Sequence, residues 1–160
     1  MAKVLILYYS CSGNTAKMAE IVAGGVRDSG AEAVVREVKD AGVDELPGFD
    51  GIIIGSPTYY GTMAAEIKKF IDDSVRHHGK LVGKVGGAFA SSGGLAGGNE
   101  TTVLDIVKAL LIHGMIVPGN VEGDHYGAVA VGAPDKRSEE QCRILGKIVA
   151  GLCVRLEGRG

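Results

Sequence analysis

Runs of consecutive apolar residues alternate along this chain with segments in which apolar residues recur at helical spacing. The first run, Val4 to Tyr9, is continuously apolar, which is typical of a parallel strand that helices cover on both faces. A polar loop and a helix follow, and Asp28 to Gly30 end that helix. Its apolar residues are Met18, Ile21, Val22 and Val26. The chain therefore opens with strand, loop and helix in direct succession.

The same alternation continues to the end of the chain. Further strands are predicted at residues 33–38, 51–55 and 84–90. A fifth strand is predicted to begin at Met115, and residues 127–131 are expected to extend it or to pair with it. Strands that alternate with amphipathic helices indicate an α/β domain with a doubly wound parallel sheet.

Three more helices are predicted between and after these strands. One spans residues 64–75, and another has an inner stripe from Val103 to Leu111 and ends at Gly114. Ser138 and Gln141 fit a capping box for the last helix. The buried face of that helix is expected to comprise Leu145, Ile148, Val149 and Leu152. No linker or repeat divides the chain, so we expect one domain over residues 1–160.

Charge and hydropathy exclude some classes of protein. The formal net charge is -2 and no cluster of Lys and Arg is present, so nucleic acid is not an expected partner. No apolar run approaches the ~20 residues of a membrane span, and Met1 leads into the first strand without the layout of a signal peptide. We therefore expect a cytoplasmic protein.

The three cysteines do not predict a disulfide framework. Cys142 and Cys153 fall on one predicted helix, roughly 16 Å apart along its axis, which is too far for a disulfide. They are expected to be buried small hydrophobic residues in a reducing compartment. Cys11 lies in the first polar loop, where packing or a backbone contact to a ligand is expected of it.

The polar loop after the first strand has the composition of a phosphate site without positive charge. Ser10, Ser12, Gly13, Asn14 and Thr15 lead directly into a helix N-terminus, where backbone N–H groups, the helix dipole and hydroxyls can hold one phosphate. The loop lacks both the P-loop pattern and the dinucleotide-binding glycine pattern. Taken alone, it is equally typical of an ordinary strand-to-helix turn with a serine cap.

Two more loops are expected at the same edge of the sheet. The third strand ends in Pro57, Thr58, Tyr59, Tyr60 and Gly61, and the adjacent aromatics offer a surface on which a flat ring can stack, although tyrosines at strand ends also serve packing. The fourth strand is followed by a glycine-rich loop whose amides can approach a ligand closely, with a flexible linker as the alternative. The residues of interest there are Ser92, Gly93, Gly94, Gly97 and Gly98.

These three loops in this order resemble the flavodoxin-like FMN proteins, and in detail the WrbA-type NAD(P)H:quinone oxidoreductases. The specific segments are residues 55–61 with the helix after them, 91–100, 113–115 and 126–128. The resemblance implies a three-layer sandwich with a five-stranded parallel sheet of strand order 2-1-3-4-5. It implies that residues 10 and 12–15 hold the FMN phosphate, that residues 57–61 line the isoalloxazine ring, and that residues 92–98 close over its pyrimidine side.

By the same resemblance His113 contacts FMN, often across a subunit boundary. Judged from the sequence alone, a histidine near a helix C-terminus is more commonly a cap. The chain departs from the WrbA-type pattern in having Ser12 in place of an aromatic residue and in lacking tryptophan, which bears on its use of NAD(P)H. The segment between Val38 and Phe49 is shorter than the family's helical insertion, which supports the tetramer of that family. The assemblies that the resemblance allows for this chain are a homodimer and a homotetramer.

Two functions follow from the resemblance. The favoured one is an enzyme in which FMN takes a hydride from NAD(P)H and reduces a quinone or a similar flat acceptor, with His113 or the amides of Gly93 and Gly94 stabilising negative charge on the flavin. The alternative is an electron carrier of the flavodoxin type that serves a redox protein partner, and a net charge of -2 gives it little steering field. A scaffold without cofactor is a third, minor reading.

Overall fold

Five parallel strands form the centre of the structure, a computed structural model that describes residues 1–158. They are β1 (Lys3–Tyr8), β2 (Glu32–Glu37), β3 (Gly51–Tyr59), β5 (Val85–Ser92) and β6 (Ala128–Val131). Their order in the sheet is β2-β1-β3-β5-β6, with parallel pairing throughout. With the short β4 left out of the count, this is the expected order 2-1-3-4-5, and the prediction is confirmed. Residues 159–160 of the expected domain lie outside the described residues.

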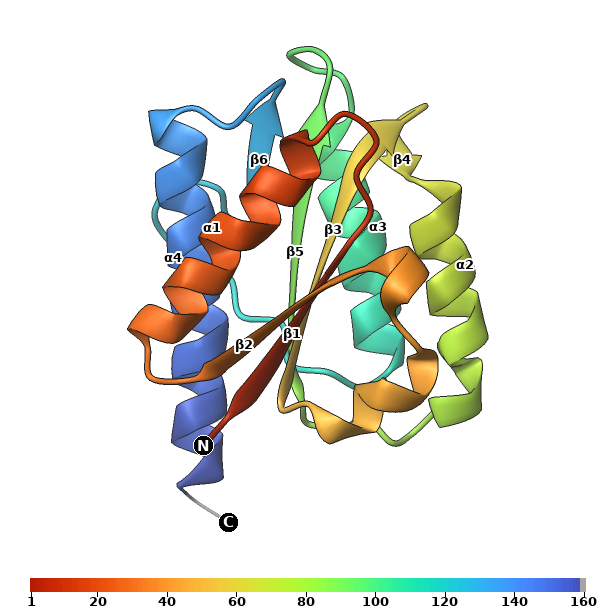
Figure 1. Cartoon of the computed structure of the whole chain (residues 1–160), viewed down its shortest axis with the longest axis vertical. Helices are drawn as coiled ribbons and strands as arrows, with labels where there is room; N and C mark the ends of the chain where they lie inside the picture. The colour runs from red at the N-terminus through yellow and green to blue at the C-terminus, as the bar shows by residue number, and fades with distance from the viewer. Residues whose placement is uncertain (159–160) are drawn as a thin grey trace.

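Helices cover both faces of this sheet, as Figure 1 shows. On one face lie α1 (Asn14–Asp28) and α4 (Lys136–Glu157), and on the other lie α2 (Ala65–Asp73) and α3 (Asn99–Ile112). Three short 3-10 helices complete the structure, at Val38–Asp40, Val43–Gly48 and Ser74–His77. The continuous apolar runs are explained by this layering, because both faces of β1 and β3 are buried. No helix within the described range is long and apolar enough to span a bilayer.

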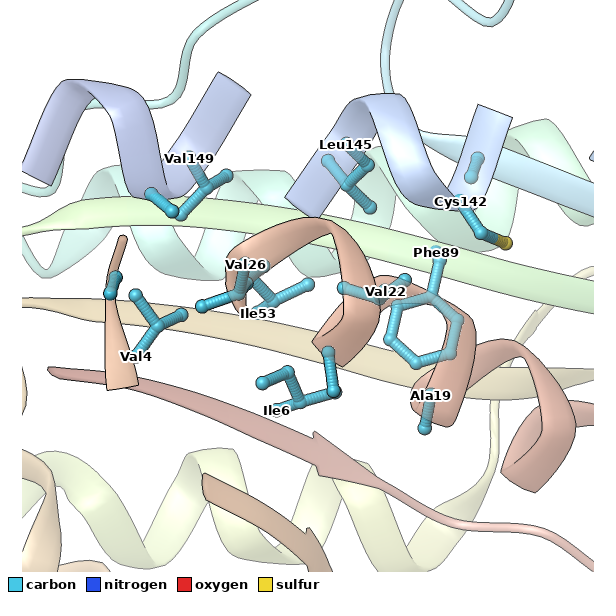
Figure 2. Packing of buried hydrophobic residues seen from close by; sticks show 14 of the residues in the cluster. Val4, Ile6, Ala19, Val22, Val26, Ile53, Phe89, Cys142, Leu145 and Val149 are labelled. Atoms are coloured by element: carbon cyan, nitrogen blue, oxygen red, sulfur yellow. The ribbon is translucent and has the colours of Figure 1, made fainter. Parts of the chain in front are cut away.

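Phe89 is the largest fully buried side chain on the α1 and α4 side of the sheet (Figure 2). Its ring lies directly over Gly55 of the neighbouring strand, where a Cβ atom would stand only 2.0 Å from the ring. Gly55 is therefore required for close packing, since any side chain there would displace the ring. This contact supports β3 at the point where the strand runs into the Pro57 to Gly61 segment.

The fifth strand differs from its prediction. Ile116 makes a single bridge to Val85, and the chain then leaves the sheet until Ala128, so the strand is β6 and not a segment that begins at Met115. Pro118 explains the interruption, because it has no N–H with which to continue the ladder. Residues 127–131 were expected to extend the Met115 segment or to pair with it; Ala128–Val131 do not pair with that segment but lie, like Ile116, alongside β5.

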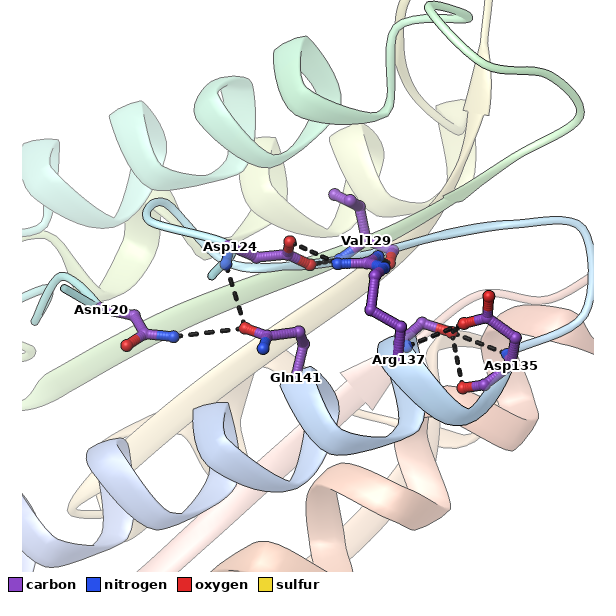
Figure 3. Close-up of polar contacts among 7 residues, drawn as sticks. Asn120, Asp124, Val129, Asp135, Arg137 and Gln141 are labelled. Atoms are coloured by element: carbon purple, nitrogen blue, oxygen red, sulfur yellow. Dashed lines mark hydrogen bonds and ion pairs between the residues drawn. The ribbon is translucent and has the colours of Figure 1, made fainter. Parts of the chain in front are cut away.

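The start of the last helix also differs from its prediction. Asp135 is the N-cap of α4: its carboxylate accepts from the backbone N–H of Ser138 at 2.8 Å, so Ser138 is the third helical residue. The Gln141 side chain is not part of the cap. Its Oε1 instead accepts from the Asp124 N–H at 3.0 Å and from Asn120 Nδ2 at 3.3 Å (Figure 3). The sequence prediction was therefore three residues late.

The thiols divide into one exposed and two buried groups, which leads to a first expected result. Cys142 and Cys153 are buried, and burial raises the pKa of each thiol to about 12, whereas Cys11 is exposed. Because the thiolate is the reactive form, both buried thiols stay unreactive at pH 8. Ellman's reagent at that pH should titrate one thiol in the folded protein and three in guanidinium chloride. A Cys11→Ser variant should give none when folded, and two fast thiols in the folded wild type would contradict the assignment.

Candidate functional site

Three loops meet at the carboxyl edge of the sheet. They follow β1, β3 and β5, and Figure 1 shows them together at one end of the molecule. The edge includes the place where the chain, having formed β2 on one side of β1, crosses to form β3 on the other. In open α/β sheets ligands bind at such a crossover. The sequence prediction that residues 10–15, 57–61 and 92–98 share one edge is confirmed.

The loop after β1 ends in a helix N-terminus that no side chain of residues 1–158 caps. Gly13 is the N-cap residue of α1, and the first turn carries no acidic residue. Ser10 Oγ accepts a hydrogen bond from the Gly13 N–H at 3.1 Å, which folds the loop back on itself. Cys11 and Ser12 are exposed. The first-turn N–H groups are thus left without a side-chain acceptor, and the local field favours an anion.

Thr15 differs from the other residues of this loop because it is buried. Its Oγ1 lies 2.9 Å from Ser91 Oγ, at the end of β5. The hydroxyl predicted to face a phosphate therefore also fastens α1 to a central strand. Ser91 was not among the predicted site residues, and no local sequence signal links two positions so far apart in the chain.

The loop after β3 is a tight hairpin that the sequence analysis did not predict. β4 (Thr62–Met63) pairs antiparallel with the end of β3, and the turn between them consists of Tyr60 and Gly61. Both turn residues have positive φ, 49° and 80°, as a type I′ turn requires. The turn holds the Tyr60 ring fully in solvent, while Tyr59 is 42% exposed. Both rings are therefore available to a ligand.

Tyr59 lies against the loop that follows β1. Burial raises the pKa of the Tyr59 phenol, and the neighbouring Cys11 raises it further. The Glu66 carboxylate is the main cause of a raised pKa at Tyr9, with burial and Cys11 adding to it. Both phenols therefore remain protonated at neutral pH. The first and second loops thus share one surface.

The loop after β5 is joined to the hairpin. Gly98, the N-cap of α3, approaches Gly61 so closely that a Cβ atom would lie 2.7 Å from the Gly61 Cα. Thr101 Oγ1 donates to the Gly61 carbonyl at 2.7 Å, and Thr102 Oγ1 donates to Thr58 Oγ1 at 3.1 Å. The second and third loops are therefore held side by side as two walls.

The third loop is braced by Ser92 and exposes two glycines, Gly93 and Gly94. Ser92 Oγ donates to the Gly94 carbonyl at 3.0 Å and accepts from Asn99 Nδ2 at 3.0 Å. A Cβ on Gly93 or Gly94 would meet nothing within 4 Å. Ser92 thus shapes the loop from within, and the two glycine amides lie on an accessible surface.

His113 is not beside these loops in its own chain. It follows α3, whose 14 residues begin at the third loop and extend about 21 Å away from it at ~1.5 Å per residue. His113 Nε2 lies 2.8 Å from Ser74 Oγ, and burial, with smaller effects of His78 and His77, lowers the pKa of the imidazole. Within one chain the structure thus separates His113 from every other predicted site residue.

A cavity of about 590 Å³ lies between the third loop and β6. Its lining includes Leu95 and Leu104, the carboxylates of Glu100 and Asp135, and the guanidinium of Arg137. None of residues 10–15 lines it, so the cavity is separate from the N-terminus of α1. The anion site and the cavity are therefore different features of the same edge.

Comparison with known proteins places this arrangement in a family. The model of the family described as Flavodoxin domain matches residues 5–109, which include all three loops. The chain belongs to the flavodoxin family. Flavodoxins carry FMN, and the charge-free N-terminus of α1 with the exposed tyrosines fits the phosphate and the flat ring of that cofactor. This flavodoxin is accordingly an FMN protein.

Individual relatives agree with this family over almost the whole chain. A protein of Archaeoglobus fulgidus named NAD(P)H dehydrogenase (quinone) is 34% identical over 98% of this chain and 100% of its own length. A flavodoxin of Aquifex aeolicus is 39% identical over 99% of this chain and 91% of its own. The crystal structure of a WrbA-like flavodoxin from Agrobacterium tumefaciens superimposes with a TM-score of 0.83 at 28% identity, covering 97% of this chain and 99% of that one.

Proposed function

We propose that this flavodoxin is a cytoplasmic NAD(P)H:quinone oxidoreductase that uses FMN. The observation that carries the proposal is the exposure of Tyr60 and Leu95, which project into solvent from the Tyr59–Tyr60 hairpin and from the 93–98 loop beside it. A flat acceptor can reach a ring held there. The Archaeoglobus relative named for this activity supports the proposal, because the alignment covers both chains nearly in full.

The proposed contacts with FMN follow the three loops. Ser10, Ser12, Gly13, Asn14 and Thr15 bind the phosphate through hydroxyls and backbone N–H groups. The isoalloxazine ring is flanked by Pro57, Thr58, Tyr59, Tyr60 and Gly61, and its pyrimidine edge receives backbone N–H groups from the segment that comprises Ser92, Gly93, Gly94, Gly97 and Gly98.

The protein's part in the reaction is binding and charge stabilisation. When bound, FMN would supply the redox chemistry, which is the transfer of a hydride equivalent from NAD(P)H to a quinone. Tyr59 and Tyr60 would contact the flat ring of the cofactor through their exposed side chains. The exposed backbone amides of Gly93 and Gly94 would serve as donors that stabilise negative charge on the ring. No protein acid or base is required.

Purified protein tests this function directly. With FMN bound, NADH or NADPH under anaerobic conditions should bleach the flavin absorbance, and a quinone should restore it. Steady-state turnover with both substrates should then be measurable. The opposite result has two parts: NAD(P)H does not bleach the flavin, and photoreduction passes through a stable one-electron stage. Such a protein would be an electron carrier of the flavodoxin type. That outcome would overturn the enzyme proposal.

We further propose that His113 completes the site of another copy in a homo-oligomer. Exposed apolar side chains gather near it at the far end of α3, among them Leu111, Ile112 and Val75. A hollow of about 370 Å³ lies there, bordered by His113 and Ile112. Exposed apolar clusters of this kind commonly mark protein interfaces. Sedimentation velocity of the FMN-loaded protein tests the proposal, and a monomer at micromolar concentration would contradict it.

A further inference from the structure

Two buried hydroxyls join the first loop to the strand that opens the third. Thr15 is 1% exposed and Ser91 is 4% exposed, and their oxygens lie 2.9 Å apart. Either hydroxyl can donate in this pair. Within residues 1–158 neither of these hydroxyls makes a second hydrogen bond, so the surrounding chain does not fix which one donates. A ligand that engages one of them would decide the direction.

A phosphate fixes that direction because its ionised oxygens only accept. If the Thr15 hydroxyl donates its hydrogen bond to the phosphate, Thr15 Oγ1 can bond Ser91 only as an acceptor. Ser91 must then be the donor. The result is a chain of two hydrogen bonds, from Ser91 to Thr15 and from Thr15 to the phosphate. Each bond in such a chain polarises the other, and the one that ends on a charged oxygen is the stronger.

We infer that Ser91 is a positioning residue that makes the site selective for the phosphorylated flavin. The Ser91 hydroxyl donates a hydrogen bond to Thr15 Oγ1. The Thr15 hydroxyl is thereby oriented to donate its own hydrogen bond to the phosphate. The inference rests on the proposed assignment of residues 10–15 to the phosphate. Ser91 would have no such effect on riboflavin, which has no phosphate for Thr15 to bind.

The location of Ser91 suits this role. β5 is paired on both sides, with β3 and with β6, so the Ser91 backbone is fixed by a central strand and not by a loop. Ser91 stands in register with Pro57 on one side and Ala130 on the other. A hydroxyl held so rigidly loses little entropy when the ligand binds, and the Thr15 rotamer is selected before FMN arrives.

The test compares the dissociation constants of FMN and riboflavin for the apoprotein, measured by quenching of flavin fluorescence. Ser91→Ala should weaken FMN about tenfold, which corresponds to ~1.4 kcal/mol. The dissociation constant of riboflavin should change by less than about twofold. Ser91→Thr keeps the hydroxyl and should restore the ratio of the two constants. Ser29→Ala, which removes a hydroxyl at the opposite end of α1 from the three loops, serves as the control and should leave both constants unchanged.

Two results would overturn the inference: no change for either ligand in Ser91→Ala, or an equal loss for both, which would make Ser91 a merely structural residue. Ser91→Cys, with a weaker donor in nearly the same volume, should give an intermediate ratio and serves if Ser91→Ala does not fold. Ser12→Glu separates this inference from the assignment beneath it. If Ser12→Glu raises the dissociation constant of FMN relative to that of riboflavin and Ser91→Ala does not, only the role of Ser91 is wrong. If neither variant raises it, the phosphate assignment fails as well.

Discussion

A Ser12→Glu variant should lose at least 100-fold in affinity for FMN while binding riboflavin almost as the wild type does. Ser12 is exposed in a loop that carries no charged residue and ends in an uncapped helix N-terminus. A carboxylate there would face a phosphate of about -1.5 to -2 charges. At ~4 Å and an effective dielectric constant of ~20, the repulsion is about 4 kcal/mol per pair of unit charges, more than the ~2.7 kcal/mol that 100-fold requires.

The controls for this result are a ligand and a second variant. Riboflavin has the ring but no phosphate, and Ser12→Gln has the size of glutamate but no charge. Ser12→Gln should therefore weaken FMN by less than tenfold, and the loss in Ser12→Glu should shrink as salt is raised. If Glu and Gln act alike, or if riboflavin is lost together with FMN, the carboxylate does not face a phosphate at this position.

A Phe89→Ala variant should lower the free energy of unfolding of the apoprotein by about 3–5 kcal/mol, measured by urea denaturation. The ring is fully buried between α1, α4 and the sheet, and its removal leaves a cavity that the paired strands are too rigid to close. Phe89→Leu, which keeps most of the volume, should cost far less. A loss below ~1 kcal/mol for Phe89→Ala would mean that the core collapses into the space.

The partner of that ring supplies an independent check. Gly55→Ala should destabilise the wild type strongly, because its Cβ would overlap the Phe89 ring, but should cost little in the Phe89→Ala background. Two residues in contact are expected to show such non-additivity. Additive losses would show that Gly55 is required for some other reason.

Much of the fold could be predicted because burial on both faces leaves a plain pattern. β1 and β3 have no polar face, so their runs stand out whichever neighbour they pair with. The fifth strand was harder, since its bridge at Ile116 and its main part at Ala128–Val131 are separated in the sequence by a segment that lies outside the sheet. The periodicity of apolar residues alone does not reveal that two such segments lie along the same neighbouring strand.

The site was predictable in its loops but not in the bonds that join them. Tyr60 and Gly61 were interpreted as a ligand platform, whereas they are also a hairpin turn, in which a non-glycine residue takes positive φ. The Thr15–Ser91 pair and the Thr101–Gly61 bond depend on how the strands are ordered in space. Asp135 was missed as the cap of α4 because Ser138 and Gln141 have the same spacing as a capping box.

The contact of Gly98 and Thr101 with Gly61 has a consequence for how the cofactor leaves. Because the first turn of α3 is bonded to the hairpin, the second and third loops cannot move apart while these contacts hold. Their separation requires that this turn unwind or that its threonine bonds break. Escape of the flavin is thereby coupled to local melting of a helix end, so residues that only stabilise that end also set how long the cofactor stays.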